Sequence, residues 1–149
     1  MSVRTFDAKK VQVIFNGLSI SGFADGTFAN VEREEQGFTK VTGADGFTSR
    51  SKSNNRSGSV TITLLQTSPS NDVLSNILAQ DELNANAVYP LTIKDLSGES
   101  LYFTSTAWIQ KAPTIQYGKE INSVEWIIDC SDLQMKVAGN AGVGVETAT

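Results

Sequence analysis

Histidine is absent from the 149 residues, and cysteine occurs once, at Cys130. Without histidine, the chain cannot form Ser-His or Cys-His nucleophile pairs, and it lacks the commonest transition-metal ligand. A lone cysteine excludes an intrachain disulfide and a cysteine-based metal cluster. Carboxylate or lysine chemistry is still open. We therefore expect no catalytic residue, no metal and no cofactor, although the composition alone does not exclude an enzyme.

Long apolar runs and net positive charge are missing as well. No apolar run approaches the ~20 residues that a membrane-spanning helix needs. Residues 1–7 have no apolar signal core, so we expect synthesis in a cytoplasm and no membrane binding by this chain alone. The formal net charge is −4, with 12 basic and 16 acidic residues. This charge argues against a chain that wraps nucleic acid, which normally requires a basic face.

What the chain does have is a series of short alternating segments joined by turn residues. The length fits one domain, 1–149, with a core of its own. Asn16-Gly17 predicts a type I′ hairpin, and Pro90 indicates an edge strand or an irregular strand start. The expected strands are 10–15, 18–21, 27–34, 38–42, 59–65, 87–95, 101–109 and 121–130, with a further short strand at 114–117.

One helix is expected, over about residues 69–84. Ser68 can cap it, and Pro69 suits the first helical position. The apolar stripe of this segment consists of Val73, Leu74, Ile77 and Leu78. Many hairpin-joined strands and one helix predict a mainly β fold: an antiparallel β-sandwich or barrel with one α-helix and a long hairpin insert at 43–57.

Alternation along two strands predicts the core. Segment 59–65 places every second apolar side chain on one face, and segment 121–130 does the same. Trp108 and Trp126 could form a ligand-stacking platform, but their alternating surroundings favour a core role. The predicted core residues are Val60, Ile62, Leu64, Trp126 and Ile128.

The most informative segment is the polar, basic insert 43–57 between two predicted strands. A hairpin needs only two to five connecting residues, and longer loops are usually functional or disordered. Without interleaved aromatic residues, a nucleic-acid stacking module is disfavoured. A disordered loop is one interpretation; a loop that docks on a neighbouring subunit is the one we favour. Its candidate contact residues are Asp45, Phe47, Arg50, Lys52, Asn54, Asn55 and Arg56.

Carboxylates alternate on two of the predicted strands. Glu32 and Glu34 share one face of their strand, and Glu125 and Asp129 share one face of theirs. The favoured interpretation is a solvated polar sheet face. A hydrolytic or hard-cation site and an acidic channel that repels DNA phosphates are the alternatives.

Several segments together resemble the tail tube proteins of contractile-tailed bacteriophages. They are the strand pair 10–20, Val-Glu-Arg-Glu at 31–34, Phe-Thr-Lys-Val-Thr-Gly-Ala-Asp-Gly at 38–46, Ser-Lys-Ser-Asn-Asn-Arg-Ser-Gly-Ser at 51–59, Gln-Thr-Ser-Pro-Ser-Asn-Asp-Val-Leu at 66–74, Asp-Leu-Ser-Gly at 95–98 and Glu-Trp-Ile-Ile-Asp-Cys-Ser-Asp-Leu at 125–133. The resemblance covers nearly the whole chain except the last ten residues. The Gly-rich tail from about residue 139 has no clear counterpart, and we expect it to be flexible.

The resemblance implies a structural virion protein without catalysis. Members of this family form hexameric rings whose sheets join into a barrel around a channel, and the rings stack into the tube inside a contractile sheath. The implied partners are further copies of the chain, the sheath, baseplate, tape measure and tail terminator proteins, and viral DNA only in transit. The insert would reach the adjacent ring, and strands 28–35, 38–42, 59–66 and 121–130 would line the channel. The candidate channel residues are Glu32, Glu34, Thr61, Thr63, Glu125 and Asp129.

Two other functions stay open at this point. One is a tube subunit of a related contractile injection machine, such as a secretion system or a tail-like bacteriocin. Such a subunit would show the same sequence features, so the sequence alone does not distinguish it. A hydrolase or lectin-like binding module on a β-sandwich would instead use the carboxylates and tryptophans.

Overall fold

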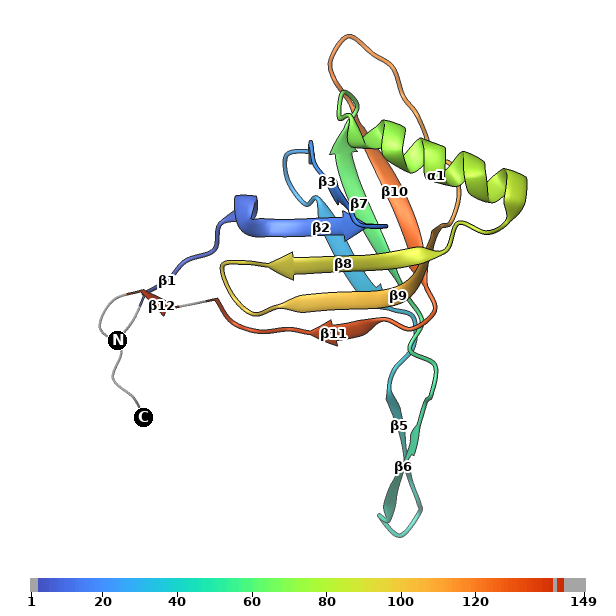
Figure 1. Ribbon diagram of the computed structural model, residues 1–149. Helices are drawn as coiled ribbons and strands as arrows, with labels where there is room; N and C mark the ends of the chain where they lie inside the picture. The colour runs from blue at the N-terminus through green and yellow to red at the C-terminus, as the bar shows by residue number, and fades with distance from the viewer. Residues whose placement is uncertain (1–2, 141, 144–149) are drawn as a thin grey trace.

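A computed structural model describes residues 3–140 and 142–143. Most strands join one eight-stranded sheet in the order β3-β2-β8-β9-β10-β7-β4, and β11 pairs with β9. Figure 1 shows this body and a separate two-stranded projection. The elements are β1 (Val3–Arg4), a 3-10 turn (Ala8–Lys10), β2 (Val11–Phe15), β3 (Leu18–Ile20), β4 (Ala29–Arg33), β5 (Phe38–Thr42), β6 (Thr48–Lys52), β7 (Gly58–Leu65), α1 (Ser70–Asn84), β8 (Tyr89–Asp95), β9 (Leu101–Ile109), β10 (Ser123–Cys130), β11 (Gln134–Lys136) and β12 (Gly142–Val143).

Strand β9 is the corner of the sheet. Its first residues pair with β8 and β11, whereas only Ala107–Ile109 pair with β10. The group β2, β8, β9, β11 therefore crosses the group β4, β7, β10, and α1 lies at one end of the body (Figure 1). The crossing encloses the core on one side of each group and leaves the other side of β4, β7 and β10 open. The predicted fold class, mainly β and antiparallel with one helix, is confirmed.

Alternation decides which side chains enter the core. In β7, Val60, Ile62 and Leu64 are fully buried, and in β10 Trp126 and Ile128 are buried opposite them. The Trp126 indole donates to Asn71 Oδ1 of α1 at 3.0 Å, so the one polar atom of this core residue is satisfied. Burial of these side chains is worth about 1.5–3 kcal/mol each. This packing joins the helix to the polar-faced half of the sheet.

The turn predicted at Asn16-Gly17 is confirmed, and one of the two alternatives for Pro90 is wrong. Asn16 and Gly17 both have positive φ, 53° and 74°, as a type I′ hairpin requires, and they join β2 to β3. Strand β8 has an irregular start, with a register shift between Tyr89 and Leu91. It lies between β2 and β9, so the edge alternative for Pro90 is wrong. The position is tolerated because the shift in register falls at Pro90, which has no N–H for a ladder bond.

Helix α1 begins one residue later than expected and ends at Asn84 as expected. The Ser68 hydroxyl accepts from Ser70 N at 3.2 Å and donates to the carbonyl of Ser21 at 2.6 Å. It therefore caps the first turn and ties the helix to the β3–β4 connection. The apolar stripe faces the body, since Leu74 and Ile77 are buried.

Two secondary-structure expectations are wrong. Thr48–Lys52, expected to be loop, forms strand β6 and pairs with β5 in a sheet of its own. Its sequence carries no apolar residue, so alternation gave no signal, and only the pairing reveals it. Residues 114–117 form no strand, because no neighbouring strand supplies a ladder.

The Gly-rich tail is only partly described. Gly142–Val143 form β12, which pairs with β1, so this part of the predicted flexible tail has a partner. Residues 141 and 144–149 lie outside the described residues. Within the described part of the chain, no helix is long and apolar enough to cross a membrane.

Candidate assembly site

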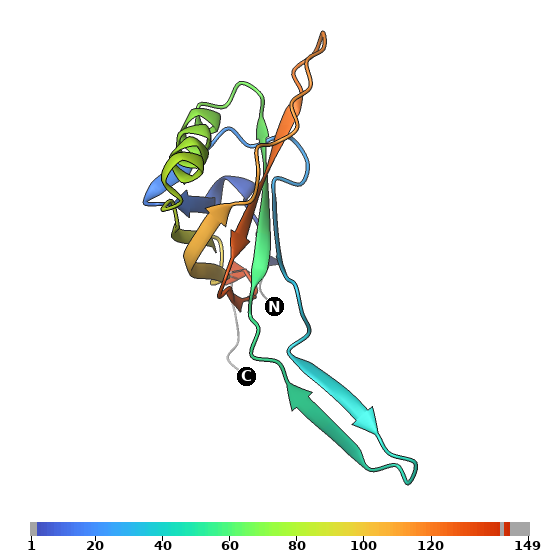
Figure 2. The same ribbon diagram turned by 90° about the vertical axis from the view of Figure 1, so that its right-hand side faces the viewer.

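The projection formed by β5 and β6, residues 38–52, is here called the arm. It continues the β4–β7 hairpin after a break, as Figure 2 shows. Arg33 pairs with Gly58 and Phe38 with Lys52, so the chain between these pairs is one residue longer on the β7 side. Two backbone bonds bridge the break: Glu34 N donates to Ser57 O at 3.1 Å, and Ser53 N donates to Gly37 O at 2.8 Å. An extra residue of this kind bends and twists a hairpin, and it turns the arm away from the plane of the sheet.

The arm is exposed along its whole length and carries cations on one face. Every residue of β5 and β6 is exposed. Lys40 pairs directly with Arg50, and the Arg50 guanidinium lies 4.2 Å above the centre of the Phe38 ring. Lys52 is on the same face, opposite Phe38. The other face is uncharged, and its Val41 is 67% exposed.

Lys40 was missed by the sequence analysis, which assigned 38–42 to the channel lining. The structure places this strand outside the main sheet, in the arm. The sequence offers no signal for this pairing, because residues 48–52 contain no apolar residue and so show no alternation. With Asp45 the only acid, residues 38–52 carry +2, while the whole chain carries −4.

The tip of the arm is a tight, hydrogen-bonded turn. Gly43 N donates to Phe47 O at 2.8 Å, and Asp45 Oδ1 accepts from Phe47 N at 3.1 Å. Gly46 has a φ of 89°, which favours glycine. The Phe47 side chain remains 73% exposed. The predicted contact residues Asp45 and Phe47 therefore lie at the tip, one holding the turn and the other presenting an apolar ring.

The base of the arm is fixed to the body of the same chain. Arg56 Nη2 donates to Asp132 Oδ2 at 3.0 Å and lies 2.9 Å from Oδ1, while Leu133 N donates to Arg56 O at 2.8 Å. Asn55 Oδ1 accepts from Ser57 N at 3.1 Å, and Asn54 is exposed beside it. From the other side, the Arg33 guanidinium donates twice to Leu133 O, at 3.1 and 2.8 Å. Of the predicted contact residues, Asn55 and Arg56 thus serve to aim the arm, whereas Arg50 and Lys52 lie along it.

The open face of β4, β7 and β10 is polar, and register shows which side chains share it. Glu32 pairs with Ser59, which pairs with Asp129. One row further along, Asn30 pairs with Thr61, and in the next row Thr63 pairs with Glu125. Glu34 follows β4 and accepts from the Ser57 hydroxyl at 3.1 Å. Five of the six candidate channel residues therefore lie on one continuous surface, and Glu34 extends it toward the arm.

The two tryptophans lie in different environments. Trp126 is buried, but Trp108 pairs with Asp129 and lies half-buried on the polar face. Only Trp126 is therefore a core residue. Asp129 also accepts from the amide of Gln110 at 3.4 Å.

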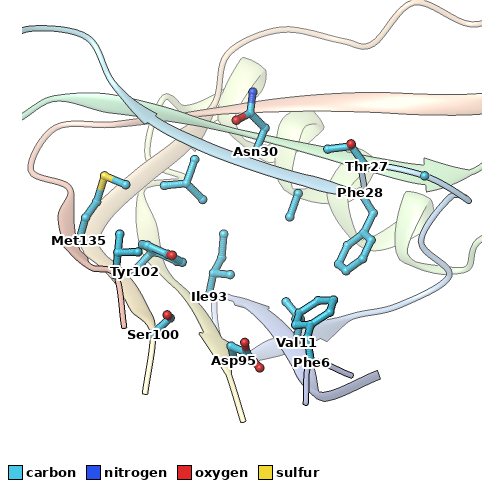
Figure 3. A pocket seen from close by; sticks show the side chains of 14 residues that line it. Phe6, Val11, Thr27, Phe28, Asn30, Ile93, Asp95, Ser100, Tyr102 and Met135 are labelled. Carbon is cyan, nitrogen blue, oxygen red and sulfur yellow. The ribbon is translucent and has the colours of Figure 1, made fainter. Parts of the chain in front are cut away.

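An apolar cavity of about 520 Å³ opens beside β4, between that strand and the group β2, β8, β9, β11. Phe28 and Phe6 point toward each other across it, and Ile93, Tyr102 and Met135 lie along its other wall (Figure 3). Strand β4 is an edge of the sheet. Thr63 N donates to Phe28 O and Glu34 N donates to Ser57 O, so even-numbered residues of β4 bond to β7. By the alternation of antiparallel ladders, the N–H groups of Ala29, Val31 and Arg33 point to the free edge.

The described part of the chain holds no group of three or more side chains that could bind a metal ion. Burial, and secondarily the charge of Asp129, raises the pKa of Cys130 from 9.0 to about 11, so the thiol stays protonated and unreactive at neutral pH. The surfaces that stand out are therefore the arm, the polar face and the open edge, all of which suit contacts between proteins.

The bacteriophage PhiTE tail tube protein family matches residues 13–138. The chain belongs to that family. Structural protein ORF10 of Pseudomonas phage KPP10 is 32% identical to it over 152 residues, which cover 97% of this chain and 88% of that protein. The chain is accordingly a structural tail tube protein of a bacteriophage, located in the virion tail. Membership of a structural family also indicates a non-enzymatic role.

Solved structures share the fold at low sequence identity. A chain in the cryo-EM structure of the anti-feeding prophage cap aligns with a TM-score of 0.64 and 11% identity, covering 93% of this chain and 95% of that one. A chain in the sheath/tube terminator of PVC, an extracellular contractile injection system, has a TM-score of 0.64 and 12% identity, with 91% and 99% covered. These similarities show that the fold of the tail tube subunit extends beyond its own family.

Proposed function

We propose that the tail tube subunit forms hexameric rings that stack into the inner tube of a contractile tail, a channel for ejected DNA. The observation that carries the proposal is the arm. A two-stranded hairpin is at best marginally stable in water, and this one has no buried residue in either strand. Its exposed Phe38, Val41 and Phe47 add apolar surface without a core. Such an arm is expected to gain its stability by packing on another subunit.

The position of the arm supports head-to-tail stacking. It leaves the body at the end opposite α1 and the 110–122 loop, as both views show (Figures 1 and 2). If the arm of one copy contacts the opposite end of the next, the two contacting surfaces are different, and the contact is heterologous. Such a contact can repeat along one direction and generate a filament. The network around Arg56 and Asp132 keeps the arm aimed along that direction.

The edges of the polar-faced sheet support ring closure. Strand β4 presents unpaired N–H and C=O groups on one side, and β9 pairs with only the last three residues of β10 on the other. At Ser123–Trp126, β10 therefore has no strand partner on this side, although residues 111–117 lie beside it. We infer that the β4 edge of the next copy pairs there. Joining these edges around a ring removes both and makes one continuous barrel.

The polar face then lines the channel. It carries Glu32, Glu125 and Asp129, and the ion pairs between described residues, Arg56–Asp132 and Lys136–Glu99, do not involve them. A carboxylate wall repels DNA phosphates, which favours passage over binding. The outer surface and the two tube ends would meet the sheath, baseplate, tape measure and tail terminator proteins.

Electron microscopy of the purified chain over a concentration series tests the proposal, with two variants that separate its parts. In the first, Asn-Gly replaces residues 38–52; the Ser53 N to Gly37 O bond holds the cut ends together. We expect rings without tubes. In the second, Ala29→Pro removes one outward N–H at the start of an edge strand, where proline is tolerated. We expect folded monomers without rings, and Ala29→Ser should assemble like the wild type.

The two variants have different expected outcomes. A chain that failed to fold would not form the rings expected of the armless variant, and circular dichroism shows whether the Ala29→Pro monomers are folded. Tubes of normal length from the armless variant would overturn the stacking role. Rings from Ala29→Pro would overturn closure through β4. A wild-type chain that stays monomeric at every concentration would overturn the proposed assembly itself.

A further inference from the structure

A groove of about 420 Å³ runs between α1 and the loop that joins β9 to β10. On the loop side, Ile115 is 47% and Tyr117 87% exposed, whereas Val124 and Trp126 at the floor are buried. The helix contributes one side, from Asn71 to Glu82. Besides these, the groove is lined by Leu78, Pro113, Val124 and Trp126. An apolar groove of this kind on a subunit that assembles calls for a definite occupant.

Glu82 is the charged residue that lines the groove, whereas Asp72 and Asp81 of the same helix do not line it. An acid beside an apolar groove favours an occupant that carries a cation. Helix α1 holds Asp72, Asp81 and Glu82 and no basic residue. Two of these acids lie near the helix C-terminus, where the helix dipole is already negative and a cation would be favourable. The cations of the neighbouring loop, Lys111 and Lys119, are not among the lining residues.

The arm has the reverse imbalance. Lys40 and Arg50 face each other across the hairpin, and like charges directly opposite are destabilising. The long stems of Lys and Arg cover apolar surface while their charged heads reach a polar rim. The cationic face, with Phe38 beneath Arg50, therefore matches a groove that has an apolar floor and one acid, Glu82, in its lining.

The length of the arm strand and the position of the groove also fit this pairing. Five residues of β5 span about 17 Å in an extended strand, and the helix from Asn71 to Glu82 rises by about 17 Å. Helix α1 and the loop that joins β9 to β10, whose residues line the groove, lie at the end of the body opposite the arm in both views (Figures 1 and 2). In a head-to-tail stack, the arm of one copy meets this end of the next.

We propose that the groove between α1 and the 110–117 segment receives the arm of a second copy in the adjacent ring. The cationic face of the arm lies inward, with Phe38 on the apolar floor and Arg50 toward Glu82. This inference rests on the proposed stacking into a tube and adds to it the receiving surface. The other possible occupants, a neighbour in the same ring or another tail protein, predict different results in the following tests.

Charge exchange tests the pairing. In electron micrographs of the assembled chain, Arg50→Glu and Glu82→Arg should each reduce the number of stacked rings per tube roughly tenfold, because all arms of a ring act together. The double variant should return to within about twofold of the wild type, since directly coupled residues are not additive. Glu99→Arg, the same charge change in the exposed β8–β9 turn, is the matched control and should stack normally.

The failures are distinguishable. Normal tubes from Glu82→Arg, or a double variant no better than the worse single one, would overturn the groove as receiver and leave the tube intact. Absence of tubes and rings from the wild type would overturn the proposed function instead. Circular dichroism of each free subunit verifies that the fold is retained.

Cysteine cross-linking tests the contact itself. Cys130 is the single native cysteine and is 1% exposed, so an introduced thiol reacts alone. Oxidised tubes of Lys40→Cys/Ala79→Cys should give a ladder of covalent oligomers, whereas either single variant should not. Assembled tubes without a ladder would contradict the proposal. As a further control, armless rings that carry only Ala79→Cys should give no ladder. A ladder from them would show that position 79 cross-links to a neighbour in the same ring.

Discussion

At the residue scale, the cationic side chains near the arm divide into those that bond to their own chain and those that lie exposed along the arm. Arg33 and Arg56 both hold the Asp132–Leu133 turn, and they fix the base of the arm. Lys40, Arg50 and Lys52 lie on the exposed arm with no acid on their face. Arginines at the base of the arm therefore hold it to the body, whereas Arg50, further along the arm, stays exposed.

Cys130 offers a prediction at this scale. Its folded pKa of about 11 lies above the ordinary 9.0, because burial penalises the thiolate. Between pH 9 and 11 the unfolded chain loses this proton before the folded one, so stability falls as pH rises. The two-unit shift corresponds to about 2–3 kcal/mol. Urea unfolding should show a loss of stability over this range that is smaller, by about that amount, in Cys130→Ala.

The Cys130→Ala comparison carries its own control. The variant loses packing at every pH, so only the change between pH 8 and 11 is informative. Other groups that titrate in this range are common to both proteins. Equal slopes for wild type and variant would contradict the assigned shift.

At the element scale, the arm is a long hairpin interrupted once. The strands β4 and β7 belong to a packed sheet, and the same two chain segments continue as β5 and β6 without any core. Alternating burial along β7 gives way to full exposure along β6. We propose that a contact between subunits supplies the stability that the second half lacks in the free chain.

Hydrogen exchange measures that dependence. In the free subunit, amides of β5 and β6 should exchange within the first seconds, because local opening of an uncovered hairpin costs almost nothing. In assembled tubes the same amides should be protected by at least about tenfold. Amides of Val60–Leu64 report on the body and should be protected in both states. An arm that exchanges equally fast before and after assembly would contradict a docked hairpin.

At the scale of the whole molecule, charge is divided unevenly between the arm and the rest of the chain. The arm carries +2, and the remaining residues together carry −6. The proposed ring closure, by contrast, would join strand edges beside an apolar cavity. The two proposed contacts therefore differ in physical character.

Salt should weaken the proposed contact between rings more than the proposed contact within a ring. Screening of exposed charges shortens from about 10 Å at 0.1 M to about 3 Å at 1 M ionic strength. Raising NaCl over this range should shorten the tubes in sedimentation and microscopy while the rings persist. Rings of the armless variant should be unaffected. Tubes that lengthen with salt would show that apolar contacts dominate stacking.

Much of the fold and part of the candidate site follow from sequence pattern. Alternation in 59–65 and 121–130 identified the core face and, by exclusion, the polar face, because side chains of a strand must alternate. The type I′ hairpin and the helix end were predictable from local chemistry at Asn16-Gly17 and Asn84. Strand β6 was not, because pairing without apolar residues leaves no pattern.

The sequence by itself thus determined the strands with an apolar face, the helix, the absence of histidine and disulfide chemistry, and the excess of cations in the insert. Only the tertiary structure decided where those cations lie. A one-residue register shift carries Phe38–Thr42 out of the main sheet, turns Arg56 back onto Asp132, and leaves Lys40 beside Arg50. These outcomes depend on pairings between segments distant in the chain, and such pairings are settled by register and packing rather than by local preference.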